Sequence, residues 1–267
     1  MNSITLLDST TWNKADLLKE MASDDFYYNY LGKTTLSSSV IKKLRKSPKS
    51  YAYTIKYGDP ITKALLLGRL LHLSVLEPEE FDKYTFVDCK SRTAKVFKDT
   101  VSQNKDKEHT IFTTKEKSEI ERLQDALFRN EQALKLLTNC EYEIPAIDYI
   151  EGIPFRGKAD ILAKGNRIVD LKTTSSIHNF ANPRSQYSAY AYDYDIQVYI
   201  YCQLFKMEAK QFQFLVIDKQ SCDIGIFNVG NDFYESGKKK TLEAIERYKM
   251  FFLEDVDLDS YTISGTL

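Results

Sequence analysis

The chain has 267 residues, of which 43% are hydrophobic and 28% charged, an ordinary balance for a globular protein that can bury a core. The net charge of −1 excludes binding of nucleic acid through overall positive charge, so a DNA-binding surface must be a local patch. The four cysteines form no CxxC pair and the sequence has neither a signal peptide pattern nor a long apolar run, which predicts reduced thiols, no zinc site and no membrane segment.

Helical patterns dominate the first part of the chain. Residues 1–35 are polar and aromatic, typical of a helix with loops, and residues 36–46 (LSSSVIKKLRK) predict a short amphipathic helix capped by serine. In GDPITKALLLGRLLHLSVLEPEEF, Asp59 is an expected N-cap because Pro60 follows at a position that suits the first helical turn. The apolar positions continue to Val75, so we expect this helix to end before the next proline.

The middle of the chain changes from helical to strand periodicity. Residues 84–113 are charged and predict a loop, after which Thr114 is an expected cap for a long helix that reaches about residue 137. From residue 141 onward, EYEIPAIDYI, IPFRGKADILA and RIVDLKTT predict a meander of strands joined by tight turns.

The last part of the chain predicts the remainder of an α/β fold. Residues 175–186 predict a polar loop, YSAYAYDYDIQVYIYCQLF a helix, QFQFLVIDK and CDIGIFNV two strands, and residues 232–252 a closing helix. This order predicts one domain over residues 1–267 with a central mixed sheet flanked by helices, in which residues 1–35 are an N-terminal extension.

Two aspartates in the meander carry the chemical signal. If Lys164-Gly165-Asn166 is a three-residue turn, Asp160 lies directly opposite Asp170, and Lys172 shares the face of Asp170 while Leu171 points to the other face. A turn of two or four residues would put the aspartates on opposite faces, and an exposed hairpin would leave both in solvent.

Opposed carboxylates repel unless a cation lies between them. Two carboxylates with open positions suit Mg²⁺ or Mn²⁺, which keep water and phosphate as their other ligands. Lys172, beside such a metal, can hold or deprotonate a water aimed at phosphorus and can stabilise charge on the phosphate.

Three further pairs of residues have both a functional and a structural explanation. Gly68 and His72 share a helix face, as do Gln197 and Tyr201 on a later helix. His72 can equally be an ordinary core histidine, and Gln197 and Tyr201 can form polar contacts within an aromatic helix. Glutamates at positions 141 and 143 open the first strand of the meander, where they can also face only solvent.

Four short motifs together resemble the RecB-like branch of the PD-(D/E)xK nucleases. GRLLH (68–72), GKAD (157–160), VDLKTT (169–174) and QVYIY (197–201) match, in order, the GxxxH, GxxD, DxK and QxxxY patterns of that family. The exonuclease VIII (RecE) nuclease domain and related phage exonucleases share the pattern, which covers about residues 36–210. Each motif alone is weak, and their order and spacing make the match specific. The resemblance implies a restriction-endonuclease-like core.

The resemblance implies a role for each matching residue. The expected metal ligands are His72, Asp160, Asp170 and the backbone carbonyl of Leu171. Lys172 would be the catalytic lysine, acting with Asp160 and Asp170. A glutamate at the start of the meander would complete the catalytic site, where Glu141 fits the family spacing better and Glu143 stays open.

Contacts to DNA are expected around the same motifs. Gln197 and Tyr201 would contact DNA or orient the lysine strand, and Arg69 and Arg156 lie next to motif residues. Arg184 belongs to the loop that follows the lysine strand, where its guanidinium is expected to bind phosphate.

The resemblance also sets expectations for cofactors. It implies Mg²⁺, with Mn²⁺ as a substitute. The sequence has no G-x-x-x-x-G-K-[ST] motif, so no ATP use is expected. Cys202 and Cys222 do not reproduce the cysteine cluster of the iron–sulfur relatives, so no such cluster is expected.

The function implied is a Mg²⁺-dependent exonuclease that digests linear double-stranded DNA from its ends, 5′ to 3′, and leaves single strands for an annealing protein in recombination. The resemblance implies a homo-oligomeric ring in the cytoplasm of a bacterial or phage-infected cell. The alternatives are a structure-specific or single-strand endonuclease, and a catalytically inactive DNA-binding module. Asp160, Asp170 and Lys172 argue against the module, because a binding protein needs no metal-activated water.

Overall fold

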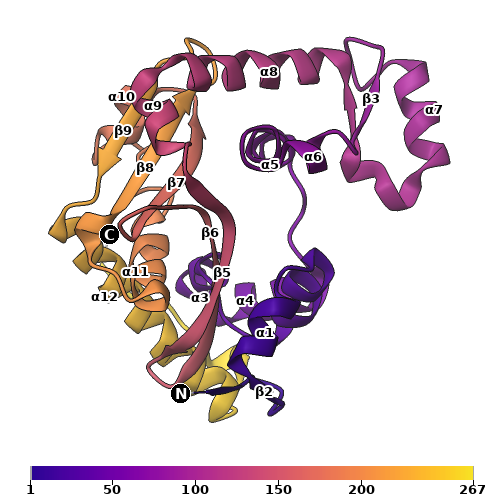
Figure 1. Ribbon diagram of the computed structural model, residues 1–267. Helices are drawn as coiled ribbons and strands as arrows, with labels where there is room; N and C mark the ends of the chain where they lie inside the picture. Colours follow the sequence, from indigo (N-terminus) through magenta and orange to yellow (C-terminus); the bar gives the residue numbers. More distant parts are fainter. Residues whose placement is uncertain (1, 267) are drawn as a thin grey trace.

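A five-stranded mixed sheet organises the chain in the computed structural model, which describes residues 2–266 (Figure 1). Its strands, in spatial order, are β5 (Cys140–Ile150), β6 (Ile153–Ala163), β7 (Arg167–Thr174), β8 (Phe212–Asp218) and β9 (Ile224–Asn228). Neighbouring strands are antiparallel except the parallel pair β7–β8, which is joined through helix α11 (Tyr194–Phe205). This arrangement confirms the predicted meander and the predicted α/β class.

Helices cover both faces of the sheet because the strand residues alternate between two apolar clusters. On one face, α3 (Ser38–Lys46), α11 and α12 (Asn231–Tyr248) pack with α4 (Pro48–Tyr57) over strand residues such as Ile168. On the other face, α5 (Lys63–Leu76) and α8 (Thr114–Arg129) pack over residues that include Leu171. Leu171 therefore points away from the face of its neighbours in sequence, as strand alternation predicts.

The N-terminal extension forms a small unit on the sheet. It contains a hairpin, two short α-helices and a π-helix: β1 (Ser3–Thr5), β2 (Thr11–Asn13), α1 (Lys14–Glu20), η1 (Phe26–Tyr30) and α2 (Leu31–Thr34). Its apolar residues pack against Ile147 of β5. The backbone of Leu36 also exchanges hydrogen bonds with Pro154 and Arg156 of β6, both 2.9 Å long.

An arm projects from the end of α5, at the right of Figure 1. It comprises α6 (Pro78–Phe81), β3 (Thr85–Val87), α7 (Lys95–Gln103), the 3-10 helix η2 (Lys105–Thr110) and β4 (Ile111–Thr113). The predicted loop over residues 84–113 is therefore wrong. The arm buries only a small cluster of Val87, Phe97 and Ile111. Because so few apolar residues are spread among many charged ones, the sequence shows no clear helix or strand periodicity there.

Three predicted helix boundaries also change. The helix predicted from Tyr187 begins only at Tyr194, because residues 187–193 form turns. Helix α5 begins at Lys63, because the Thr62 side chain accepts a hydrogen bond from the amide of Leu65, while the predicted cap Asp59 pairs with Lys43 at 2.5 Å. Thr113 rather than Thr114 caps α8, in a capping box with Glu116.

The remaining elements are short. The long helix predicted to about residue 137 breaks at Asn130, whose side chain caps the separate helix α9 (Glu131–Leu136). The others are α10 (Ile177–Ala181), η3 (Ala209–Gln211), η4 (Lys249–Leu253) and η5 (Leu258–Ser260).

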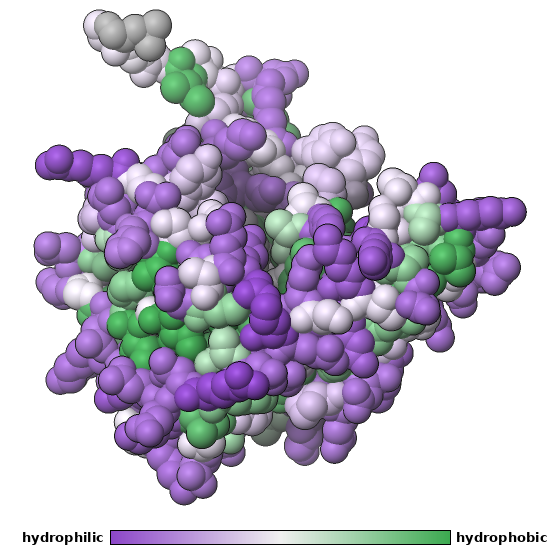
Figure 2. Space-filling view, turned by 90° about the horizontal axis from the view of Figure 1, so that it is seen from above, coloured by the Kyte–Doolittle hydropathy of each residue, from purple (hydrophilic) through white to green (hydrophobic). Residues whose placement is uncertain are grey.

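Within residues 2–266, no helix combines the length and apolar composition that a membrane crossing requires. In the space-filling view from above, hydrophilic residues dominate the visible face and hydrophobic residues gather in separate areas (Figure 2).

Candidate active site

The β6–β7 hairpin has the predicted register. Lys164-Gly165-Asn166 forms its turn, in which Gly165 and Asn166 have left-handed φ angles of 86° and 54°. The last residue pair toward the site is Ile161↔Val169, so Asp160 and Asp170 occupy the next opposed positions. The strands separate there, which leaves space for side chains between them.

Asp160 and His72 bind the two backbone groups of Leu171. The amide of Leu171 donates a hydrogen bond to Oδ2 of Asp160 at 2.9 Å, and Nε2 of His72 donates to the Leu171 carbonyl at 2.7 Å. With its proton on Nε2, His72 presents the Nδ1 lone pair to Oδ2 of Asp160 at 3.6 Å. Two electron-rich atoms that face each other favour a cation between them.

Glu143 joins this pair, whereas Glu141 does not. Ligand atoms of His72, Glu143 and Asp160 all lie within 4.8 Å of one another. Glu143 has a φ of 51°, an uncommon conformation for a non-glycine residue, and it interrupts the β5–β6 pairing opposite Asp160. Glu141 pairs with Leu162 nearer the hairpin turn and is exposed.

This placement corrects the expectation that Glu141 completes the site. The motif spacing favoured Glu141, but it could not decide which of the two glutamates completes the site. Residues 141 and 143 belong to the same face of an ideal strand. Burial raises the pKa of Glu143 to about 8, and the negative charge of Asp160 adds to the increase.

Asp170 and Lys172 form an ion pair on the α11 side of β7. Asp170 is completely buried, and its Oδ2 lies 2.5 Å from Nζ of Lys172. Its Oδ1 accepts a hydrogen bond from Nε2 of Gln197 at 2.6 Å. Burial raises the pKa of Asp170 to about 6, against the opposing effect of Lys172. Burial alone would lower the pKa of Lys172, but the charges of Asp170 and Asp160 outweigh it and raise the pKa.

Gln197 and Tyr201 therefore hold the strands in position. Tyr201 is buried and donates a hydrogen bond to the backbone carbonyl of Lys158 at 2.9 Å. The glycine of the GKAD motif permits this contact, since a Cβ at Gly157 would lie 2.9 Å from the Tyr201 ring and 3.0 Å from Leu204. Through these contacts both side chains connect α11 to the strands. Their contact with DNA stays a prediction.

We expect Gly157→Ala to destabilise the fold by about 1–3 kcal/mol, because the added methyl group overpacks the contact between β6 and α11. Urea unfolding measures this loss. Gly68→Ala is the control, since a Cβ at Gly68 meets no atom within 4 Å and alanine favours a helix. Equal stability of Gly157→Ala and the wild type would contradict the close packing.

Arg156 is not placed to bind DNA, which corrects that expectation. It is 6% exposed, and its guanidinium donates hydrogen bonds to the carbonyl of Leu31 at 2.7 Å and the hydroxyl of Thr35 at 2.8 Å. The guanidinium also lies 4.9 Å from the ring centroid of Tyr27. Motif adjacency could not reveal this role, because the N-terminal extension that covers Arg156 is distant in sequence.

Arg156→Gln is expected to lower the free energy of unfolding by roughly 2–4 kcal/mol, because it breaks buried hydrogen bonds that attach the N-terminal extension. At temperatures where the variant is folded, its affinity for duplex DNA should equal that of the wild type. Chemical unfolding and fluorescence anisotropy test the two statements. A selective loss of DNA affinity would contradict the structural role.

The other two predicted arginines remain accessible. Arg69 on α5 pairs with Asp24 of the N-terminal extension at 3.0 Å and has half of its side chain exposed. Arg184 is exposed in the segment between α10 and α11. Their contacts with DNA stay predictions.

Some residues near the site were not among the predicted site residues. Lys158, inside GKAD, lies 3.5 Å from Asp24 and covers the Tyr27 ring. The ring of Tyr194 contacts the ammonium groups of both Lys172 and Lys42, which lie 5.1 and 4.9 Å from its centroid. Lys158 could have been found from its motif, whereas Lys42 and Tyr194 meet only through tertiary packing.

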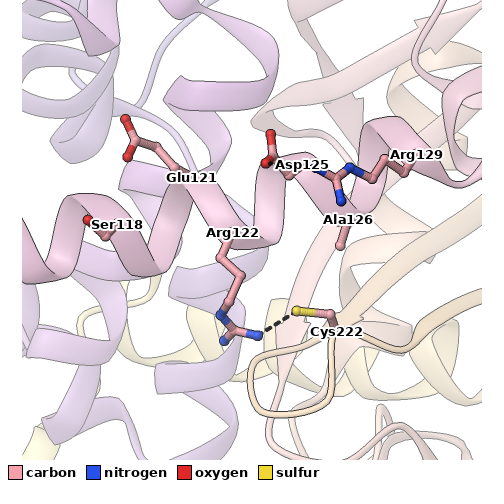
Figure 3. Close-up of a pocket in the computed structure, with 7 residues that line it drawn as sticks. All are labelled: Ser118, Glu121, Arg122, Asp125, Ala126, Arg129 and Cys222. Atoms are coloured by element: carbon pink, nitrogen blue, oxygen red, sulfur yellow. Dashed lines mark hydrogen bonds and ion pairs between the residues drawn. The ribbon is translucent and has the colours of Figure 1, made fainter.

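A surface pocket of about 500 Å³ lies away from the candidate active site (Figure 3). Its residues, apart from Cys222, belong to α8: Ser118, Glu121, Arg122, Asp125, Ala126 and Arg129. Arg122 points toward the Cys222 thiol and donates a hydrogen bond to it, while Glu121 points away. This pocket contains none of the predicted catalytic residues.

The chemistry of the central group fits a divalent metal ion. His72, Glu143 and Asp160 offer one imidazole nitrogen and two carboxylates, and the raised pKa of Glu143 reflects in part the repulsion that a cation would remove. The mixed nitrogen and oxygen donors suit Mn²⁺ as well as Mg²⁺. Asp170 lies outside this group, so its predicted role as a ligand stays a prediction.

Comparisons with solved structures support the fold. A protein from Eubacterium rectale named "Putative exonuclease" superposes with a TM-score of 0.63 at 16% identity, over 92% of this chain and 95% of that chain. At this identity the likeness shows a shared fold. A phage related exonuclease from Haemophilus somnus 129PT superposes over 85% of this chain and 99% of that chain, at 17% identity. Its TM-score of 0.36 is too low to indicate a shared fold.

Sequence comparison identifies the family. No curated protein sequence matches the chain. Residues 37–257 match the family described as a PDDEXK-like domain of unknown function (DUF3799). The matched region contains the GxxxH, GxxD, DxK and QxxxY motifs and the residues of the candidate active site. The chain therefore belongs to this family of PDDEXK-like domains, as the four motifs predicted.

Proposed function

We propose that the protein is a metal-dependent nuclease that hydrolyses phosphodiester bonds of DNA. The observation that carries this proposal is the convergence of His72, Glu143 and Asp160 within 4.8 Å of one another, at the point where β6 and β7 separate. The ion pair of Lys172 and Asp170 lies on the neighbouring strand. Membership of a PDDEXK-like family supports the same reaction class.

Each side chain has a distinct part in this reaction. A divalent ion, when bound by the carboxylates and His72, would activate a water and polarise the phosphate. Lys172 stays protonated, because neighbouring carboxylates raise its pKa, so its ammonium stabilises negative charge on phosphate rather than removing a proton from water. Asp170 orients that ammonium, and Gln197 fixes Asp170 through the hydrogen bond to Oδ1.

The finer assignment rests on the four motifs. We propose Mg²⁺ as the metal, with Mn²⁺ as a substitute, and the ends of linear double-stranded DNA as the substrate. The resemblance to RecE-like enzymes supports 5′ to 3′ digestion, a homo-oligomeric ring, and transfer of the product strand to an annealing protein during recombination. The same resemblance supports a cytoplasmic location.

Digestion of end-labelled linear duplex with Mg²⁺, Mn²⁺ or EDTA tests activity, metal requirement and direction together. We expect release of label with either metal, none with EDTA, and no cleavage of a closed circular plasmid. Cleavage of the circle would favour the endonuclease alternative. DNA binding without cleavage under every metal condition would favour the inactive DNA-binding module.

A further inference from the structure

Gly68 occupies the interior of α5 without a packing reason. A Cβ at this position would meet no atom within 4 Å, and its backbone is helical. Glycine inside a helix costs about 1 kcal/mol relative to alanine. The contrast is Gly157, where Tyr201 and Leu204 occupy the space. The missing side chain therefore leaves open a volume that the protein itself does not fill.

This volume belongs to a pocket of about 270 Å³ between α5, α8 and the ends of β7 and β8, which we call the α5–α8 pocket. Its lining residues are Ala64, Leu67, Gly68, Glu119, Ile120, Arg122, Leu123, Thr173 and Lys219. Gly68 lies one helical turn before His72 on the same helix face. Thr173 lies two residues after Leu171 on the α5 side of β7, and the Leu171 carbonyl accepts the hydrogen bond of His72. The pocket thus borders the candidate active site.

The lining is suited to part of a nucleotide. Half-buried Leu67 offers apolar surface for the face of a base, together with the small exposed parts of Ile120 and Leu123. Thr173 and Lys219 offer a hydroxyl and an ammonium for sugar and phosphate oxygens. Among residues 2–266, Lys219 has no carboxylate within 4.0 Å and is exposed, so its charge is available. The volume is too small for a duplex and suits one nucleotide.

The other charged residues of the pocket, Glu119 and Arg122, contact neighbouring groups. Glu119 pairs with Lys115 one turn earlier in α8, with 3.9 Å between their charged atoms. Arg122 donates a hydrogen bond to the backbone carbonyl of Lys219 at 2.6 Å and another to the Cys222 thiol. Arg122 is therefore a positioning residue that fixes the segment carrying Lys219 against α8.

We propose that the α5–α8 pocket binds one nucleotide of the cleaved strand, next to the phosphate held at His72, and that Gly68 is required because any side chain there would enter the nucleotide's space. This inference rests on the proposed nuclease function. It assigns Gly68 and Lys219 to substrate positioning rather than to catalysis.

Gly68→Leu tests the inference, because leucine favours the helix and projects into the pocket. We expect a melting temperature equal to or above that of the wild type, kcat/KM on end-labelled duplex lowered about tenfold or more, and inhibition by thymidine 5′-monophosphate weakened about tenfold. Gly68→Ala should show the same changes in smaller degree.

Lys219→Ala provides a second test that leaves the pocket walls intact. Loss of one phosphate contact should lower kcat/KM about three- to tenfold and reduce its dependence on salt. Lys239→Ala is the matched control, since Lys239 is also exposed, belongs to α12 and does not line the pocket. The control should behave as the wild type.

The outcomes separate this inference from the proposed function. If the wild type cleaves DNA and Gly68→Leu keeps kcat/KM and nucleotide inhibition within about twofold, the pocket does not bind substrate and the inference fails alone. A Gly68→Leu variant that loses activity only in proportion to lost folding, with Lys219→Ala unaffected, also overturns it. If the wild type cleaves no nucleic acid with either metal, the proposed function itself fails.

Discussion

Cleavage of linear DNA by Lys172→Met is expected to fall by roughly 10³-fold or more, because the ammonium beside Asp170 supplies the fixed positive charge for the developing phosphate charge. The variant should still bind duplex DNA in EDTA. Initial rates on end-labelled duplex and anisotropy binding curves measure the two quantities.

The same variant should also be less stable, by roughly 3–5 kcal/mol, because it leaves Asp170 buried without its cation. The pKa of Asp170 is already raised to about 6, so the folded state favours the protonated acid. A raised pKa contributes stability below the unfolded value, and this contribution is lost as pH rises through the folded value. The deficit should therefore be largest near pH 8 and smaller near pH 5.

Lys240→Met is a matched control for this loss of an ion pair. Lys240 lies 2.8 Å from Asp195, which is as buried as Asp170, and the two lysines have similar exposure at 20% and 17%. We expect a comparable loss of stability with cleavage retained at temperatures where the variant is folded. Equal loss of cleavage in both variants would show that Lys172 acts only through stability.

Glu143→Gln is expected to make the protein more stable in EDTA at alkaline pH and to abolish its response to metal. Because the pKa of Glu143 is about 8 in the folded protein, ionising it costs free energy. The wild type should lose stability as pH rises from about 4.5 through 8, and glutamine avoids this loss. The gain should reach up to about 5 kcal/mol at pH 8.5 and vanish below pH 4.5.

Saturating Mn²⁺ should stabilise the wild type at pH 8 by about 2–3 kcal/mol, as expected for a ligand at roughly a hundred times its Kd. Glu143→Gln should show little of this increase and no cleavage. Glu141→Gln, two residues earlier and exposed, should match the wild type in both respects. If only Glu141→Gln loses the metal response, Glu141 rather than Glu143 is the carboxylate of the site.

The hairpin predictions, which relied on neighbouring residues, succeeded. Strand alternation and the Lys164-Gly165-Asn166 turn determine the register of the β6–β7 hairpin, so the opposition of Asp160 and Asp170 was accessible from the sequence. The motif spacing also singled out His72, which the structure places beside Asp160 although its contact with the Leu171 carbonyl joins residues 99 positions apart. Its role as a metal ligand stays a prediction.

The arm over residues 84–113 was missed because its buried cluster is small, so the charged positions outweigh the apolar pattern. Arg156 was assigned to DNA for a similar reason. Its position beside a motif suggests function, whereas the chain that covers it arrives from the N-terminal extension through Leu31 and Thr35.

The sequence by itself determined the α/β class and the hairpin register, since both depend on alternation and spacing along one segment. It also singled out His72 and Asp160, two of the three side chains that converge at the candidate active site. Only the tertiary structure decided that Glu143 faces His72, that Arg156 is buried and that Gly68 borders a pocket. The positions of these three residues depend on which distant segments pack together and on the strained backbone angle at Glu143. Neither can be predicted from the local sequence pattern.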